Sequence, residues 1–244
     1  MNPQDLPVAI LAGGLATRLR PVTENIPKAL LPVAGRPFLA HQLDLLRQQG
    51  VQRVVLCVGF LGEMILEAFP TGQPWGIQLE YSFDGERLLG TGGAIRQALP
   101  LLGTAFGVLY GDSYLPTDFR AVARFFAASG KPALMTVFAN SGRWGASNVH
   151  FQDGRIIVYD KRNLTPQMQH IDYGLSCLTP GAFAGVPPES PLDLARVFQI
   201  LLAANQLAGY EVTKRFYEVG SPAGIAELEA FLKLQHHDLH QTTS

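Results

Sequence analysis

The sequence has few charged residues, few cysteines and no long apolar run, and each shortage excludes a class of protein. Charged residues make up 16% of its 244 residues and the net charge is −1, whereas ~25% charged residues is usual. The chain therefore has no overall positive field for nucleic acid or for an anionic membrane surface. No stretch approaches the ~20 apolar residues that a membrane-spanning helix needs. We expect no nucleic-acid or membrane partner, and an anion site only where positive side chains gather locally.

The two cysteines, Cys57 and Cys177, each lie inside an apolar run. Two such distant residues give neither a disulfide framework nor the spacing of a zinc site. They are expected to be buried, reduced thiols, as in proteins of the cytosol. The N-terminal stretch MNPQDLPVAILAGG has no basic residue ahead of its short apolar run, unlike a secretory signal peptide. We therefore expect a cytoplasmic protein.

Apolar segments of two kinds alternate through the first 140 residues. Short, β-branched runs are typical of buried strands, whereas Leu39, Leu43 and Leu46 follow the spacing of a helix face. Alternating strands and helices predict an α/β fold, Rossmann-like, with a mainly parallel sheet and helices on both faces. Strands are expected at 7–12, 51–60, 77–83, 105–110 and 133–139, and helices at 37–49, 62–69, 90–99 and 119–126.

The alternation of expected strands and helices ends near residue 140. Three strand-like segments, SNVHF, RIIVYD and IDYGLSCL, follow one another with short turns between them. They predict a β-rich insertion, followed by a helix at 192–207, a strand at 210–216 and a helix at 224–235. We expect one domain over 1–244, with parts at about 1–140 and 141–244.

Residues 13–28 join glycines to positive charge directly after the first expected strand. Gly13 and Gly14 lie in neither a Walker loop nor a GxGxxG fingerprint. A tight turn explains the glycines but not the basic residues behind them. Glycine allows close backbone approach to phosphate oxygens, arginine offers a bidentate fork, and lysine offers a point charge. The stretch therefore predicts an anion site, to which Arg18 and Lys28 contribute, whereas Arg20 fits a solvated neighbour equally well.

The stretch GGLATRLRPVTENIPKALLPVAGRPFL resembles the signature of the sugar nucleotidyltransferases, which make nucleotide sugars from a nucleoside triphosphate and a sugar 1-phosphate. Later segments resemble further motifs of the same family in the same order. LGTGGAI (89–95) resembles the base-and-sugar motif, and YGD (110–112) the motif with a magnesium aspartate. VYDKR (158–162) resembles the sugar-phosphate lysine motif, and YEVGSP (217–222) the segment with a second metal carboxylate.

The resemblance implies a role for each matching residue. Arg18, Lys28 and Asp112 would be catalytic, and Mg²⁺ would be held by Asp112 and Glu218. The nucleotide would be bound by Leu11, Ala12, Gly13, Gly14, Thr17, Gly90, Thr91, Gly92 and Gly93. The sugar phosphate would be bound by Gly111, Asp160, Lys161, Tyr173 and Gly174. On this division, about 1–140 binds the nucleotide, and 141–244 binds the sugar phosphate and completes the metal site.

Four positions depart from the family's usual pattern. Ala16 replaces a glycine of the loop, and Arg162 replaces a proline after the lysine. Tyr173 stands where a smaller polar residue is common. Glu218 replaces aspartate and carries its carboxylate one methylene further, which puts the metal position in doubt.

The implied reaction needs no general base, because the attacking sugar-phosphate oxygen is ionised at neutral pH. It needs relief of repulsion between two polyanions and in-line placement, which positive groups and Mg²⁺ supply. Among the branches of that family, the chain resembles the heptose- and mannose-1-phosphate guanylyltransferases most in its short length and in LGTGGAI, with uridylyl- and cytidylyltransferases open. A non-catalytic nucleotide-sugar sensor is the rival, and a dinucleotide oxidoreductase lacks its glycine fingerprint. The oligomeric state stays open, with a homodimer as one option.

Overall fold

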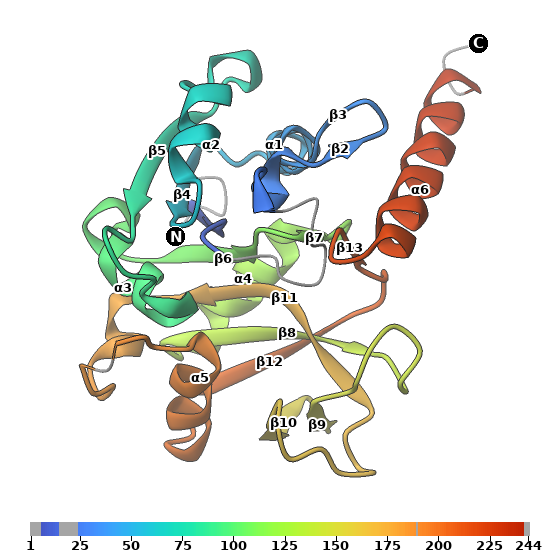
Figure 1. Cartoon of the computed structure of the whole chain (residues 1–244). Coiled ribbons are helices and arrows are strands. Elements are labelled where there is room, and N and C mark those ends of the chain that lie inside the picture. Colours follow the sequence, from blue (N-terminus) through green and yellow to red (C-terminus); the bar gives the residue numbers. More distant parts are fainter. Residues whose placement is uncertain (1–5, 15–23, 189, 242–244) are drawn as a thin grey trace.

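The computed structural model describes residues 6–14, 24–188 and 190–241. The centre of the molecule is one nine-stranded mixed sheet (Figure 1). Its strands are β1 (Val8–Leu11), β4 (Arg53–Val58), β5 (Gln78–Phe83), β6 (Phe106–Tyr110), β8 (Ala133–Ala139), β9 (Val149–Gln152), β10 (Arg155–Tyr159), β11 (His170–Leu178) and β12 (Leu207–Val212).

Four neighbouring strands, in the order β6-β1-β4-β5, are parallel. β1, β4 and β6 are largely apolar without alternation because helices cover both of their faces, whereas the edge strand β5 alternates polar and apolar residues. Parallel strands bring their carboxyl ends to one edge of a sheet, where ligands of open α/β folds bind. The expected α/β fold with a mainly parallel sheet is confirmed.

The β-rich insertion joins the same sheet. β11 runs antiparallel to β6, β8 and β9, and β10 pairs with β9. β12 returns parallel to β8. One long strand, β11, therefore connects the parallel half of the sheet with the later strands.

Helices on the two faces of the sheet bury two separate apolar clusters. α1 (Phe38–Gln48), α2 (Gly62–Ala68) and α4 (Phe119–Ser129) pack on one face, and α3 (Gly90–Leu102) and α5 (Leu194–Ala203) on the other. The face of α1 that meets the sheet includes Leu39, Leu43 and Leu46, all with 0% exposure. Burial of each such side chain contributes about 1.5–3 kcal/mol to stability.

The helix expected at 192–207 is shorter than expected, and the strand expected at 210–216 begins earlier. Asp193 caps α5 by accepting the N–H of Ala195 at 2.9 Å. Asn205 adopts a φ of 54°, a left-handed conformation that ends a helix. The chain can then enter β12 at Leu207, so part of the apolar run is strand rather than helix.

A third apolar cluster holds the last helix, α6 (Pro222–Gln241), against α1. It also includes residues of two short ribbons, β2 (Pro32–Val33) with β3 (Arg36–Pro37) and β7 (Ser113–Tyr114) with β13 (Tyr217–Glu218). In Figure 1, α6 rises beside these ribbons and away from the main sheet. Cys57 and Cys177 are free and buried, as expected. In the described part of the chain, no helix is long and apolar enough to cross a membrane.

Candidate active site

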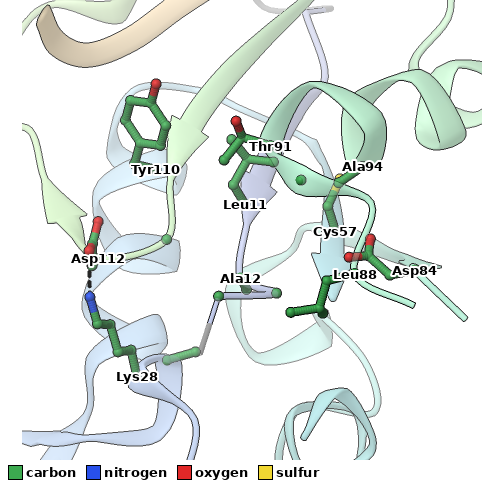
Figure 2. A pocket seen from close by; sticks show the side chains of 15 residues that line it. Leu11, Ala12, Lys28, Cys57, Asp84, Leu88, Thr91, Ala94, Tyr110 and Asp112 are labelled. Atoms are coloured by element: carbon green, nitrogen blue, oxygen red, sulfur yellow. Dashed lines mark hydrogen bonds and ion pairs between the residues drawn. The ribbon is translucent and has the colours of Figure 1, made fainter. Parts of the chain in front are cut away.

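A cavity of about 250 Å³ opens at the carboxyl ends of the parallel strands, beside the start of α3 (Figure 2). It brings together residues that follow β1, β4, β5 and β6. Its lining consists of Leu11, Ala12, Gly13, Gly14, Lys28, Ala29, Cys57, Asp84, Leu88, Gly90, Thr91, Ala94, Tyr110, Gly111 and Asp112. Nine of the residues proposed from the sequence are therefore in one cavity.

Two glycines allow the strand ends to approach one another closely. A Cβ at Gly111 would lie 2.3 Å from the carbonyl oxygen of Leu11, and a Cβ at Gly13 would lie 3.0 Å from the nitrogen of Gly59. Gly111 also donates its N–H to Leu11 at 3.1 Å. A side chain at Gly111 would push the turn that carries Asp112 away from β1.

Lys28 and Asp112 form an ion pair at one end of the cavity (Figure 2), with 2.7 Å between Nζ and Oδ2. Lys28 begins a single 3-10 turn, η4 (Lys28–Leu30), directly after the extended Pro27. Asp112 follows β6 and is about one-third exposed, at 34%. The extended Pro27 and the end of β6 therefore place a positive and a negative side chain next to each other, and both side chains are partly exposed.

The opposite end of the cavity is apolar apart from one carboxylate. Figure 2 shows Asp84 and Leu88 beside Cys57, across the cavity from Lys28. Oδ2 of Asp84 accepts the N–H of Leu89 at 3.1 Å. Burial raises the pKa of the Asp84 carboxyl group, and the bond from Leu89 lowers it in part. Burial also raises the pKa of the Cys57 thiol to about 12, which keeps that thiol neutral.

The first four residues of α3, Gly90 to Gly93, divide into two pairs. Gly90 and Thr91 line the cavity. Gly92 and Gly93 instead donate their N–H groups to the carbonyl of Leu192, at 2.8 and 3.2 Å. These two amide donors are therefore engaged within the protein, and a nucleotide contact by Gly92 or Gly93 stays a prediction. Their lack of a side chain has another reason, because a Cβ at Gly92 would lie 2.9 Å from Cγ of Leu192.

Lys161 contacts two tyrosines, Tyr110 and Tyr159, and Tyr110 lines the cavity. Its Nζ lies 3.4 Å from the hydroxyl of Tyr110, and its ammonium lies 5.3 and 5.9 Å from the ring centres of Tyr110 and Tyr159. Asp172, with 3% side-chain exposure, lies 3.9 Å from the same Nζ. The Tyr159 hydroxyl donates to Asp172 at 3.0 Å. Burial, reinforced by Asp172, raises the pKa of both tyrosines, so both hydroxyls remain donors.

The remaining sugar-side residues occupy different environments. Asp160 is partly exposed and accepts the N–H groups of Arg162 and Asn163, and bonds led by the Asn163 side chain lower its pKa. Tyr173 is 1% exposed, in the core, so its side chain does not face the cavity. Gly174, with φ 97°, packs against the ring of Tyr110. A substrate contact for Tyr173 would have to use its backbone.

The backbone at Glu218 lies beside the turn that carries Asp112. Its strand β13 pairs with β7, and the next residue, Val219, donates its N–H to the carbonyl of Asp112 at 2.9 Å. The Glu218 side chain is exposed and has an interaction partner. No cluster of three or more metal-binding side chains exists among the described residues. Mg²⁺ prefers one or two carboxylates together with phosphate and water oxygens, so Asp112 and Glu218 are ligands of the right chemical kind, and their role at the metal stays a prediction.

Thr17 and Arg18 lie outside the described residues. The sequence interpretation missed Asp84 and Asp172, which the structure places beside the predicted residues. Asp84 directly follows β5, so the rule that site residues follow strands could have found it. Asp172 lies within β11, and no local pattern marks it.

Comparisons with known proteins show the family and the fold of the chain. Residues 8–145 match the family model described as nucleotidyl transferase. The chain is similar to the N-acetylmuramate alpha-1-phosphate uridylyltransferase of Neisseria meningitidis, with 32% identity over 91% of this chain and 96% of that protein. It is similar to the D-glycero-alpha-D-manno-heptose 1-phosphate guanylyltransferase of Campylobacter jejuni, with 33% identity over 71% of this chain and 76% of that protein. The inositol-1-phosphate CTP transferase structure from T. maritima has the same fold, with a TM-score of 0.76, 22% identity and coverage of 94% and 97%.

Proposed function

Because the chain belongs to the nucleotidyl transferase family and is a sugar-1-phosphate nucleotidyltransferase, we propose that it uses GTP to convert a sugar 1-phosphate into a GDP-sugar. The observation that carries the choice of base is the Asp84 carboxylate at the apolar end of the cavity. The ion pair of Lys28 and Asp112 marks the opposite end, where the phosphates would lie.

In the proposed reaction, an oxygen of the sugar phosphate attacks the α-phosphorus of GTP. A new P–O bond forms, the bond to the β-phosphate oxygen breaks, and pyrophosphate leaves with the electron pair. Lys28, with Arg18 from the sequence motif, would stabilise the charge of the leaving group. Lys161 would hold the sugar phosphate. Bound Mg²⁺ would neutralise phosphate charge, held by Asp112 and Glu218.

Guanine suits a carboxylate better than the other bases do. Its Watson–Crick edge presents two adjacent donors, N1–H and N2–H₂, which one carboxylate can accept together. Uracil has a single donor between two acceptors, and cytosine and adenine place an acceptor beside their amino group. A carboxylate facing those acceptors would meet repulsion, and water screens that repulsion less at a half-buried carboxylate than at an exposed one. Asp84 therefore favours guanine in two ways: it attracts the two donors of guanine, and it repels the acceptors of uracil, cytosine and adenine.

Pyrophosphate release with each of four nucleoside triphosphates against a set of sugar 1-phosphates tests this proposal. We expect GTP to give the highest kcat/KM. Asp84→Asn should lower kcat/KM for GTP about 10- to 100-fold, as loss of a charge-assisted hydrogen bond worth about 1.5–3 kcal/mol implies. Asp153→Asn, in an exposed turn away from the cavity, is the matched control and should change nothing. Preference of the unaltered protein for UTP would overturn the assignment.

UTP is the second candidate, because the uridylyltransferase of Neisseria meningitidis matches the chain over 96% of its own length. For the sugar, a heptose or mannose 1-phosphate is proposed, supported by similarity to the heptose enzyme of Campylobacter jejuni. The two free, buried thiols support a reducing compartment, the cytoplasm, as the location.

A further inference from the structure

A buried glutamine on α1 lies behind the turn that carries Asp112. Gln42 has 0% exposure. Its Nε2 donates to the carbonyl of Tyr110 at 3.2 Å and to the carbonyl of Ser113 at 2.9 Å. These two carbonyls stand on either side of Gly111 and Asp112. One side-chain amide therefore closes both ends of the turn.

We propose that Gln42 is a positioning residue for Asp112, and that it fixes the carboxylate where it can serve the metal and the nucleotide. The role of Asp112 in this inference rests on the proposed function. The hydrogen bonds from Gln42 to the Asp112 turn do not depend on that function. A turn after a strand has carbonyl groups that no ladder satisfies. An amide nitrogen has two donors, so a glutamine can satisfy two carbonyls at once without adding charge beside Asp112.

Packing alone does not account for a glutamine at this position. The neighbouring buried residues on the same helix face, Leu39, Leu43 and Leu46, are apolar. Among the described residues, Oε1 of Gln42 has no hydrogen-bond partner. Burial of an unpaired amide oxygen costs free energy that an apolar side chain of similar size would avoid. The two donated bonds are the contribution that only the amide makes.

The same helix also holds the other member of the ion pair. The N–H of Phe38, at the start of α1, donates to the carbonyl of Leu31 at 2.9 Å, directly after the turn that begins with Lys28. Gln42 lies one helical turn further along. Lys28 and Asp112, which meet at 2.7 Å, are therefore both positioned from α1. On its other side the Asp112 turn is held by β1, through the bond from Gly111 to Leu11.

Gln42→Met tests the proposal, because methionine keeps the length of the side chain and removes both donors. We expect the Mg²⁺ concentration for half-maximal rate to rise about 10- to 100-fold, as for other groups that orient a metal ligand. KM for the sugar 1-phosphate should change by less than about twofold, because that substrate binds elsewhere. Independently of turnover, amide hydrogen exchange at 111–113 should become faster.

Leu46→Met is the matched control, since Leu46 lies one helical turn beyond Gln42 and is equally buried. It should lower the thermal midpoint to a similar degree but leave amide exchange at 111–113 and the Mg²⁺ requirement unchanged. Should Gln42→Met not fold, Gln42→Asn, whose amide is one methylene too short, gives the same comparison. Unchanged exchange at 111–113 in the Gln42 variants, or an equal change in Leu46→Met, overturns the proposal. An unaltered protein that is inactive with every substrate rejects the proposed function instead.

Discussion

Two lysine residues approach the cavity from different parts of the sequence, and their environments differ. Lys28 is paired with Asp112 at 2.7 Å beside β1. Lys161, from the later part of the chain, lies over the rings of Tyr110 and Tyr159. The proposed reaction assigns them to different substrates, the nucleoside triphosphate and the sugar phosphate.

Replacement of each lysine by alanine should therefore separate the two substrates. Lys28→Ala should lower kcat/KM for the nucleoside triphosphate about 10²- to 10³-fold, as loss of a donor to developing charge does. Lys161→Ala should chiefly raise KM for the sugar 1-phosphate, about 10- to 100-fold. Steady-state kinetics with each substrate varied in turn measures both effects. Lys131→Ala, which removes a surface contact to Asn205, is the control. Changes confined to the nucleotide parameters in both variants would contradict a two-sided site.

The Asp84 carboxyl group also predicts a pH-dependent effect on stability. Its pKa is raised by burial in the folded protein, so the folded state binds its proton more readily than the unfolded state. Stability therefore falls as pH rises through the window between the unfolded and the folded pKa, and the penalty is complete above it. Asp84→Asn keeps an oxygen for the N–H of Leu89 and removes that penalty.

Thermal unfolding of Asp84→Asn across pH measures this penalty. The variant should have a higher thermal midpoint than the unaltered protein at neutral pH, and the difference should shrink as the solution becomes acidic. Asp153→Asn should show no such trend, because Asp153 is exposed. A difference that is constant across pH would mean that the carboxylate is not destabilised by its surroundings.

At the level of elements, the start of α3 depends on a segment about a hundred residues away. Gly92 and Gly93 donate to the carbonyl of Leu192, and Leu192 donates to the carbonyl of Leu89. Thr91 donates to Asp193 at 3.1 Å, and Asp193 is the cap of α5. The N-terminus of α3, which lines the cavity, is thus joined to that of α5.

Gly92→Ala tests this junction. Alanine is the better helix former by about 1 kcal/mol, but its Cβ would lie 2.9 Å from Leu192 and 3.1 Å from the backbone of Asp193. Overpacking of this kind costs about 1–3 kcal/mol, so we expect a net loss of stability in chemical denaturation. Gly185→Ala, where a Cβ meets nothing within 4 Å, should be neutral or slightly stabilising. A Gly92→Ala protein more stable than the original would show that Leu192 and Asp193 can shift to accommodate the added methyl group at little cost.

Much of this fold could be predicted because its signals are local. The spacing of Leu39, Leu43 and Leu46 identifies α1, and the glycines after β1 identify the edge of the sheet where the cavity lies. The hydrogen bonds of Gly92 and Gly93 to Leu192 could not be predicted, because the carbonyl that accepts them is distant in sequence. The same applies to Gln42, since nothing around it in the sequence shows that its amide meets the turn after β6.

At the level of the whole molecule, the two parts proposed from the sequence share one sheet. β11 lies between β6 and β8, and β8 lies between β11 and β12. A chain cut after residue 140 would keep β8 without either neighbour and would leave one edge of β6 unpaired. The two parts are therefore not independent folding units.

We accordingly expect the fragment 1–140 to show no cooperative thermal transition, whereas the full chain unfolds in one. Circular dichroism during heating, together with binding of a dye for exposed apolar surface, measures the difference. Mixing with the fragment 141–244 is the control, because it restores β11 and β12. A sharp transition for 1–140 alone would show that the parallel half of the sheet is sufficient to fold.

The place of β11 also determines when the protein can fold during its own synthesis. β6 and β8 leave the ribosome well before His170 begins the strand that pairs with both. At about 5–20 residues per second, the nascent chain spends several seconds with apolar, unpaired strand edges. Such edges are templates for pairing between chains. We expect the yield of this protein in cells to depend on chaperones during that interval, more than on the stability of the finished fold.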